Sequence, residues 1–168
     1  MDSSRAPDLD RASEADARAV LSRCCGSTRW VERMLARVPF GTLEQMRAAA
    51  RTEWFALSPA DWREAFTHHP RIGDRESLRR RFAATRDLSE REQSAAEGAS
   101  EDVLAALAEA NAAYEARFGY IFIVCATGRS AEEMLGMLRA RLDNKPDEEI
   151  RVAAEEQAKI TELRLLGL

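Results

Sequence analysis

The sequence predicts an all-α fold: a single-domain helical bundle of about eight helices, with one extended apolar segment, 119–128, threaded through the core. Three observations support this. Apolar residues recur at helical spacing in nearly every segment, helix start signals precede many segments, and only one stretch is rich in β-branched residues. The 168 residues are 45% hydrophobic, enough for a folded core. We expect a flexible N-terminal arm over residues 1–12 and the helical domain over residues 13–168.

The first half of the chain contains four predicted helices with clear start and stop signals. Ser13 and Asp16 have the spacing of a capping box. Ser58 followed by Pro59 is an N-cap with proline at the first helical position. The fourth helix should end before Pro70, which disfavours a helical residue ahead of it. The four helices are predicted over 13–25, 28–38, 42–57 and from Ser58 to near His69.

The second half continues the helical pattern after a predicted loop over 69–74. A short basic helix has Leu78 and Phe82 as its apolar contacts, and Ser89 and Ser100 each mark a helix start. Helices are predicted over 75–84, from Ser89, over a long stretch from Ser100, over 130–142 and over 146–166.

The segment 119–128 differs from the rest because it is β-branched, aromatic and bounded by glycines. Alone it is typical of a buried strand, yet no second segment offers itself as a partner. Two alternatives remain. It is a helix despite poor propensity, or it is an extended segment in a helical core, whose free N–H and C=O groups become available to a ligand.

Composition and charge exclude several classes of protein. The formal net charge of -4 argues against a nucleic-acid-binding domain. No run approaches the ~20 apolar residues of a membrane span, and the N-terminus has no secretory signal pattern. The three cysteines contain no metal-binding C-x-x-C spacing and no disulfide framework. We expect a cytoplasmic protein that contacts neither membrane nor nucleic acid.

The only two histidines, His68 and His69, are adjacent at the predicted end of a helix. Histidine titrates nearest neutral pH and is the commonest general acid or base, so one of them is a candidate catalytic residue. The alternative is a helix C-terminus whose dipole favours histidine. A metal site is not expected, because Glu64 and His68 form the only pair at i, i+4 spacing and no third ligand is evident.

Two further groups are candidates for ligand binding. Ser89 and Glu92 have capping-box spacing, but capping does not require the neighbouring Gln93, and a carboxylate beside an amide can recognise a ligand rich in N–H groups. Arg164 lies in an apolar part of the last helix, where it is either a surface residue with a buried stem or an anion clamp. The arginine-dense stretch 75–86 is diluted by acids and is interpreted as a solvated face.

Taken together, these motifs resemble the 2-oxo-4-hydroxy-4-carboxy-5-ureidoimidazoline (OHCU) decarboxylases of urate degradation, from about residue 15 to the end. The order and spacing of several separate motifs make the resemblance specific. They are His69-Pro70 before Ile72-Gly73; Ser89-x-x-Glu92-Gln93; Asn111-x-x-Tyr114-x-x-x-Phe118-Gly119-x-x-Phe122-Ile123-Val124-Cys125-Ala126; Arg141-Leu142-x-Asn144; and Glu155 leading into Lys159-Ile160-x-x-Leu163-Arg164-Leu165.

The resemblance implies an all-α homodimer that converts OHCU to (S)-allantoin with loss of CO2, with no metal and no organic cofactor. It implies His69 and Glu92 as catalytic residues. The substrate-binding residues that it implies are Pro70, Ser89, Gln93, Phe122, Ile123, Val124, Cys125, Ala126 and Arg164.

Two other functions remain as alternatives. One is a non-catalytic helical module that binds a ligand or regulates a partner on the same fold. Convergence of His69 and Glu92 on one pocket would favour the enzyme. The other is a nucleic-acid-binding protein that uses arginines of 75–91, which the acidic net charge opposes.

Overall fold

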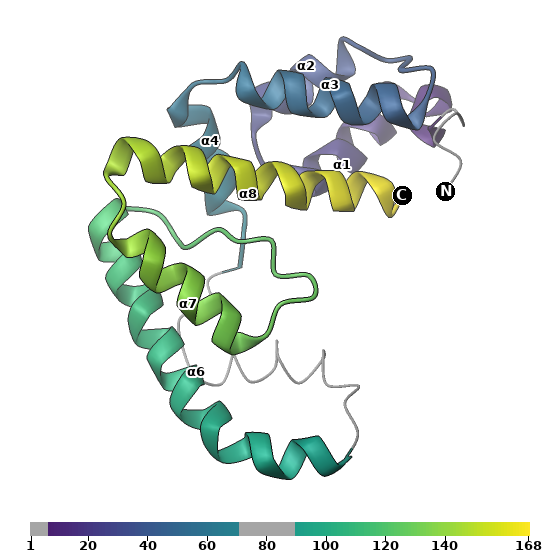
Figure 1. Cartoon of the computed structure of the whole chain (residues 1–168). Helices are drawn as coiled ribbons and strands as arrows, with labels where there is room; N and C mark the ends of the chain where they lie inside the picture. Colours follow the sequence, from purple (N-terminus) through teal and green to yellow (C-terminus); the bar gives the residue numbers. More distant parts are fainter. Residues whose placement is uncertain (1–6, 71–89) are drawn as a thin grey trace. The chain divides into compact units, whose positions relative to one another are not determined.

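Helices are the only regular secondary structure among the described residues, which confirms the predicted all-α fold class. The computed structural model describes the backbone of residues 7–70 and 90–168, and the side chains of 7–70 and 101–168. These residues contain no strand. The predicted helix over 75–84 lies outside the described ranges. The elements, labelled in Figure 1, are η1 (Asp8–Arg11), α1 (Glu14–Cys24), α2 (Thr28–Leu35), α3 (Leu43–Phe55), α4 (Pro59–Thr67), α6 (Glu90–Phe118), α7 (Ala131–Leu142) and α8 (Pro146–Leu166).

The chain divides into two compact units. Unit 1 consists of Met1–His69 and Ile150–Leu168, and unit 2 of Pro70–Glu149. The chain returns from unit 2 to unit 1 within the first turn of α8. The predicted domain over residues 13–168 therefore contains both units, and its boundary at residue 13 remains a prediction.

Hydroxyl N-caps explain where most of the helices begin. Each cap side chain accepts a hydrogen bond from the backbone N–H three residues later, which satisfies one of the free donors at the helix start. Ser13, Ser58 and Ser130, the first residues of three predicted helices, all do this, and Ser58 forms a full capping box with Asp61. The predicted helix starts at these three positions are thus confirmed.

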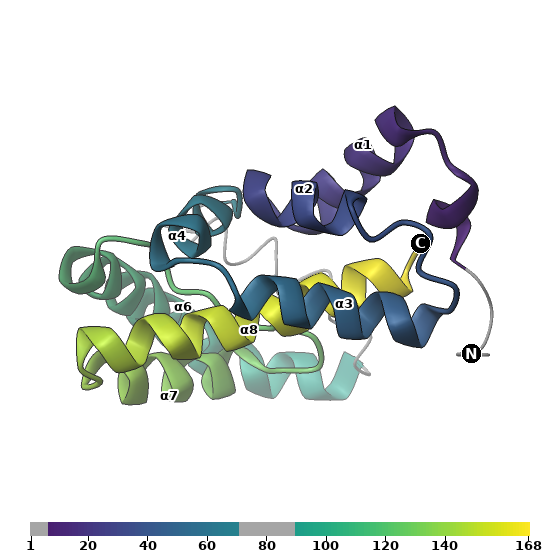
Figure 2. The same cartoon turned by 90° about the horizontal axis from the view of Figure 1, so that it is seen from above.

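In unit 1, α3 runs antiparallel to α8, as both views show (Figures 1 and 2). The indole of Trp54 donates to the carbonyl oxygen of Ala154 at 2.9 Å. Ion pairs join Arg51 to Glu155, at 2.9 Å, and Arg47 to Glu162. Burial of the tryptophan surface together with its satisfied N–H makes this pair of helices a stable support for the rest of the unit.

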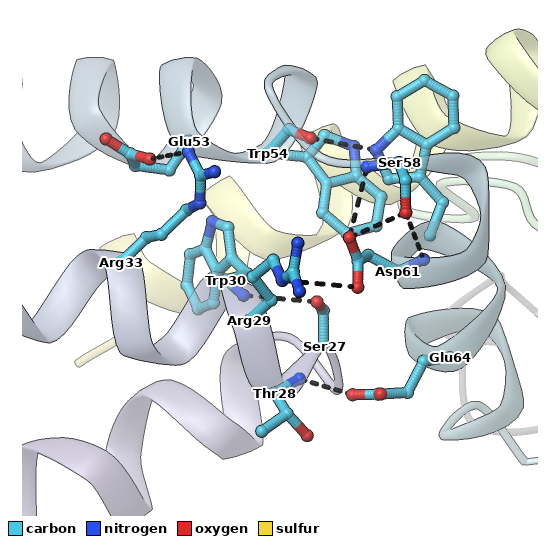
Figure 3. A network of polar contacts seen from close by, with 11 residues as sticks. Ser27, Thr28, Arg29, Trp30, Arg33, Glu53, Trp54, Ser58, Asp61 and Glu64 are labelled. Carbon is cyan, nitrogen blue, oxygen red and sulfur yellow. Dashed lines mark hydrogen bonds and ion pairs between the residues drawn. The ribbon is translucent and has the colours of Figure 1, made fainter.

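Helix α2 packs against α1, α3 and α4 in the same unit. Its N-cap Ser27 is fully buried, and the backbone N–H of Thr28 donates to the Glu64 carboxylate at 2.5 Å (Figure 3). The buried Trp30 donates its indole N–H to the carbonyl oxygen of Ala50. A carboxylate at a helix N-terminus is electrostatically favourable, so Glu64 ties α4 to the start of α2.

The N-terminal residues from Pro7 onward pack on unit 1. Leu9 is buried, and the Asp10 carboxylate accepts hydrogen bonds from the backbone N–H groups of Phe40 and Gly41 at 2.8 and 2.9 Å. Only residues 1–6 of the expected arm lie outside the described ranges. Within residues 7–12, a buried leucine is followed by an aspartate that caps a distant turn, and the flexibility expected of the arm remains a prediction.

The predicted separate helix start at Ser100 is wrong. Helix α6 is continuous from Glu90 to Phe118, through both Gly98 and Ser100. Serine favours N-caps because its hydroxyl competes with the backbone, but within a helix it costs only about 0.5 kcal/mol relative to alanine. Flanking alanines and acidic residues outweigh that cost.

Among the described residues, no helix is both long enough and apolar enough to cross a membrane.

Candidate active site

His69 follows directly on α4 and is held at the helix end by backbone and side-chain hydrogen bonds. Its backbone N–H donates to the carbonyl oxygen of Phe66 at 3.3 Å. Its ring Nε2 lies 2.5 Å from Oε1 of Gln157 on α8. The ring is half-buried, whereas His68, the C-cap of α4, is exposed. Of the two histidines, only His69 has the partly buried, oriented imidazole that a catalytic base requires.

Gln157 belongs to a row of polar residues along one face of α8, at positions i, i+4 and i+7 with Thr161 and Arg164. Its Nε2 donates to Oγ1 of Thr161 at 3.0 Å. Gln157 and Thr161 are 1% and 5% exposed, so each polar atom needs a protein partner. The Thr161 hydroxyl also acts on the thiol of Cys25, whose pKa it lowers against the larger effect of burial. A chain of neutral polar groups therefore leads from the imidazole into the interior of unit 1.

The cysteines beside this row are not reactive thiols. Burial raises the pKa of the Cys25 thiol to about 11, against the opposing effects of hydrogen bonds from Ser27 and Thr161. Burial also raises the pKa of Cys24. Because the thiolate is the nucleophilic form, both side chains stay protonated and inert at neutral pH. Among the described residues all three cysteines are free thiols.

Arg164 reaches the C-terminal end of α1. Its Nη1 donates to the carbonyl oxygen of Cys24 at 3.2 Å and lies 3.5 Å from that of Arg23. Carbonyl groups at a helix C-terminus attract cations, so α1 orients this guanidinium. The residue itself is exposed, and its predicted role in substrate binding remains a prediction.

The two residues at metal-ligand spacing, Glu64 and His68, are engaged in other contacts. Glu64 accepts the N–H of Thr28, and the ring of His68 lies against Gly26 so closely that a Cβ at that position would overlap it. Gly26 therefore makes room for His68. Among the described side chains, no three His, Cys, Asp or Glu residues are grouped in a way that could hold a metal ion.

In unit 2, the segment over residues 121–126 is neither helix nor strand. Gly119 and Gly128, at either side, have φ of +81° and +75°, a region that favours glycine. Ile123 and Val124 are buried, at 2% and 6% exposed. Of the two alternatives left open by the sequence, the helix is wrong, because residues 121–126 form no helix.

A buried ion pair holds this segment to α7. Arg141 is paired with Glu149 at 2.6 Å, with side chains 8% and 0% exposed. The same guanidinium donates from Nη1 to the carbonyl oxygen of Ile123 at 2.7 Å, and it lies over the ring of Phe122. The segment's backbone is thus fixed by a charge-assisted hydrogen bond instead of a neighbouring strand.

Two further donors complete the hydrogen bonding of Glu149. The hydroxyl of Tyr114 on α6 donates to Oε1 at 2.5 Å, and the side-chain amide of Asn144 donates to Oε2 at 2.9 Å. Burial, and next the hydrogen bond to the Glu149 carboxylate, raise the pKa of Tyr114 far above its usual range. The motif residues Asn144, Tyr114 and Arg141 thus form a structural cluster with Glu149 that holds the backbone carbonyl of Ile123.

The structure describes the predicted site residues to different extents. His69 and Arg164 belong to unit 1. Gln157 on α8 contacts His69, and Arg164, which is also on α8, contacts the end of α1. Ser89 lies outside the described residues, and of Glu92 and Gln93 only the backbone, within α6, is described. Convergence of His69 with Glu92 therefore remains a prediction. The predicted residues that belong to unit 2 are Pro70, Phe122, Ile123, Val124, Cys125 and Ala126.

Sequence reasoning missed Gln157, Thr161 and Glu149. All three lie on the last helix, where an amide, a hydroxyl and a carboxylate look like ordinary surface residues. A signal was present for the first two: they are spaced i, i+4 with Arg164 three residues later, among the apolar residues of the same helix. No comparable local pattern marks Glu149.

The arrangement defines a helical protein with an oriented histidine, an anchored arginine and an extended apolar segment of fixed backbone. The sequence profile of the OHCU decarboxylase family matches residues 10–166. The chain belongs to the OHCU decarboxylase family. The resemblance that the motifs indicated is thus confirmed.

Individual relatives agree with this assignment. The chain is 42% identical over 148 residues to the uric acid degradation bifunctional protein TTL of Arabidopsis thaliana, covering 86% of this chain and 45% of that protein. It is 27% identical to a 2-oxo-4-hydroxy-4-carboxy-5-ureidoimidazoline decarboxylase of Haloferax volcanii, over 81% of this chain and 79% of that one. A crystal structure of OHCU decarboxylase in the presence of (S)-allantoin matches with a TM-score of 0.71 and 36% identity, over 93% of this chain and 97% of that chain. The chain spans less than half of the Arabidopsis relative.

Proposed function

We propose that this protein decarboxylates OHCU to (S)-allantoin in urate catabolism. The observation that carries the proposal is the family match over residues 10–166. The solved OHCU decarboxylase that this chain resembles was crystallised in the presence of (S)-allantoin, the product of the proposed reaction. The oriented imidazole of His69 supports the proposal independently, since an acid–base residue needs a held ring.

The reaction requires no electron sink beyond the substrate. The ring carbon of OHCU that carries the carboxylate also carries a hydroxyl and adjoins a C=N bond. When the carbon–carboxylate bond breaks and CO2 leaves, its electron pair forms a carbon–carbon double bond in the ring, and the π electrons of the C=N bond move to the nitrogen, which takes up a proton from solvent. The hydroxyl then gives up its proton to become a carbonyl, and a proton is added at the neighbouring carbon. Because the substrate itself accepts the electrons, we propose a reaction independent of metal and organic cofactors.

We propose that His69 and Glu92 are the catalytic residues. His69 handles the hydroxyl proton and the new C–H proton, and Glu92 with Gln93 binds the ureido group so that one face is protonated. Arg164, which α1 orients, holds an anionic or carbonyl oxygen of the substrate. Ser89, Pro70 and the segment over residues 122–126 contribute the remaining contacts.

A stereochemical assay tests the activity and the key residue together. Urate is oxidised and hydrolysed enzymatically to fresh OHCU, the purified protein is added, and circular dichroism follows the appearance of (S)-allantoin. We expect the signal to grow rapidly with the parent protein, and the His69→Ala protein to lose about 10²- to 10⁴-fold in kcat/KM, the usual contribution of a general acid–base residue.

The matched control is His68→Ala, which removes an exposed neighbouring imidazole and should leave turnover near that of the parent. Addition of a chelator should leave the rate unchanged if no metal takes part. Racemic allantoin at the spontaneous rate, with a well-folded parent protein, would contradict the proposal and would direct attention to a ligand-binding role. Full stereospecific turnover by His69→Gln would contradict the role of His69.

We further propose that the protein acts in the cytoplasm as a homodimer. The family resemblance supports the dimer, and protonated thiols without disulfide bonds at Cys24 and Cys25 are compatible with a reducing compartment. Sedimentation velocity at micromolar concentration should give twice the mass of the 168-residue chain. A single species of monomer mass would contradict the dimer, and a fluorescent fusion found outside the cytoplasm would contradict the location.

A further inference from the structure

We propose that Gln157 and Thr161 are positioning residues that hold His69 in the tautomer protonated at Nε2, so that Nδ1 is the nitrogen that exchanges protons with the substrate. The tautomer is a property of the folded protein alone. Its catalytic meaning rests on the proposed decarboxylation.

The geometry links three side chains in series. Nε2 of His69 faces Oε1 of Gln157 at 2.5 Å, and Nε2 of Gln157 faces Oγ1 of Thr161 at 3.0 Å. The Thr161 hydroxyl also acts on the Cys25 thiol, whose pKa it lowers. Gln157 and Cys25 are each 1% exposed and Thr161 is 5% exposed, so their hydrogen bonds cannot be exchanged freely with water.

Such a chain can run in two directions. In the first, the imidazole donates from Nε2 to the amide oxygen, the amide N–H donates to the hydroxyl oxygen, and the hydroxyl donates to sulfur. In the second, every donor is reversed: the thiol donates to the hydroxyl, the hydroxyl to a flipped amide, and the amide N–H to an unprotonated Nε2. The direction of the chain therefore decides the tautomer of His69.

Geometry and donor strength favour the first direction. The amide oxygen of Gln157 faces the imidazole, and its amide nitrogen faces the Thr161 hydroxyl. A thiol is also a weak donor, so the second direction depends on the weakest donor in the series, whereas the first asks sulfur only to accept.

The proposed chemistry adds a third argument. A general base becomes an imidazolium during turnover, and both nitrogens then donate. In the first direction the amide oxygen accepts from Nε2 in both charge states, so nothing need move when Nδ1 gains its proton. In the second direction a protonated Nε2 would face an amide N–H, and the Gln157 side chain would have to flip in every cycle.

Nuclear magnetic resonance of the intact protein reads the tautomer directly. Long-range correlation of ring ¹⁵N with ring ¹H distinguishes the two neutral tautomers, at a pH at which the imidazole is neutral. The chain has 2 histidines, so a His68→Asn protein assigns the His69 signals by elimination. We expect the Nε2–H pattern for His69. The Nδ1–H pattern, or rapid averaging of the two tautomers, would overturn the proposal.

A matched pair of variants tests whether Thr161 sets this state. Thr161→Val has nearly the same shape but lacks the hydroxyl, and Thr161→Ser keeps it. We expect Thr161→Ser to retain the Nε2–H pattern and Thr161→Val to show a mixture of tautomers, because the Gln157 amide has lost its anchor. Identical tautomer populations in the two variants would show that Thr161 has no such role.

The kinetic readout separates this proposal from the decarboxylase proposal. Thr161→Val should lower kcat by about tenfold, as loss of an outer partner of a functional histidine commonly does, with little change in KM. Thr161→Ser should recover most of that loss. If the parent protein shows the Nε2–H pattern but no turnover of OHCU, the proposed activity fails and the positioning role of Gln157 stands. If the parent protein turns over OHCU but shows the Nδ1–H pattern, the positioning role fails and the proposed activity stands.

Discussion

The two units fasten a predicted site segment to a helix by different chemistry. In unit 2, the backbone at Ile123 is held by Arg141, whose charge is balanced by the buried Glu149. In unit 1, His69 is held by the neutral amide of Gln157, backed by the Thr161 hydroxyl. A full charge beside an imidazole would shift the pKa of the ring. A charge that holds a backbone carbonyl shifts no pKa of that group, because the carbonyl does not titrate. In these two units, therefore, an ionic anchor holds a backbone carbonyl and a neutral anchor holds a titratable ring.

The largest expected effect on stability comes from breaking the ionic anchor. Arg141→Met leaves the carboxylate of Glu149 buried with no opposite charge and removes the donor to the Ile123 carbonyl. Loss of one partner of a buried pair costs about 3–5 kcal/mol. Urea unfolding of the parent and the variant measures the difference in the free energy of unfolding.

The double variant Arg141→Met, Glu149→Leu is the control for this prediction. Removing both charges should recover much of the loss, because the penalty comes chiefly from an uncompensated buried charge. A single variant that loses less than about 1 kcal/mol would mean that the Arg141–Glu149 pair is not an anchor.

Breaking the neutral anchor should cost less stability. Gln157→Leu leaves Thr161 with one hydrogen bond fewer and His69 without its amide acceptor. An unsatisfied buried polar group costs about 1–3 kcal/mol. The same urea titration checks this value. If Gln157→Leu were as destabilising as Arg141→Met, the distinction between the two kinds of anchor would not hold.

The smallest effect is expected for an ionic contact near the surface of unit 1. Burial raises the pKa of Glu53, but hydrogen bonds from Arg37 and Arg33 outweigh it, and the net pKa lies below the ordinary value of 4.5. A lowered folded-state pKa adds stability above pH 4.5 that is lost as the pH falls through the folded value.

Glu53→Gln tests this contribution. Its arginine partners are 43% and 47% exposed, so the loss at neutral pH should stay below about 1 kcal/mol. The difference from the parent should shrink as the pH falls below 4.5, as urea midpoints at about pH 7 and about pH 3.5 would show. A difference that grows toward acid would contradict the assigned direction.

Helices and their starts were predictable from the sequence because their causes are local. A serine hydroxyl at position 13, 58 or 130 binds an N–H three residues away, and both groups are visible in one short stretch of sequence. The helix start predicted at Ser100 is wrong because a local signal can be outweighed. The serine was present, but the helix-forming residues on both sides continue the helix through it.

The candidate site was harder to predict from the sequence, because its parts come from distant stretches of the chain. Gln157 lies 88 positions from His69, and nothing near either residue indicates that they meet. Glu149 is fully buried, yet in the sequence it sits among the acids at the start of a helix, where a solvent-exposed role is the ordinary expectation. The motif Arg141-x-x-Asn144 was recognised only through the family resemblance, and the structure supplies its physical meaning as an anchor.

The missing Cβ at Gly26 links that position to His68 in evolution. Any other residue at position 26 would occupy space that the His68 ring now fills. Inherited changes at the two positions should therefore be correlated: a larger residue at 26 becomes acceptable once a smaller one stands at 68. Change at Gly26 is thus restrained by the neighbour of the candidate base, and the residues allowed at one position depend on the residue at another, 42 positions away.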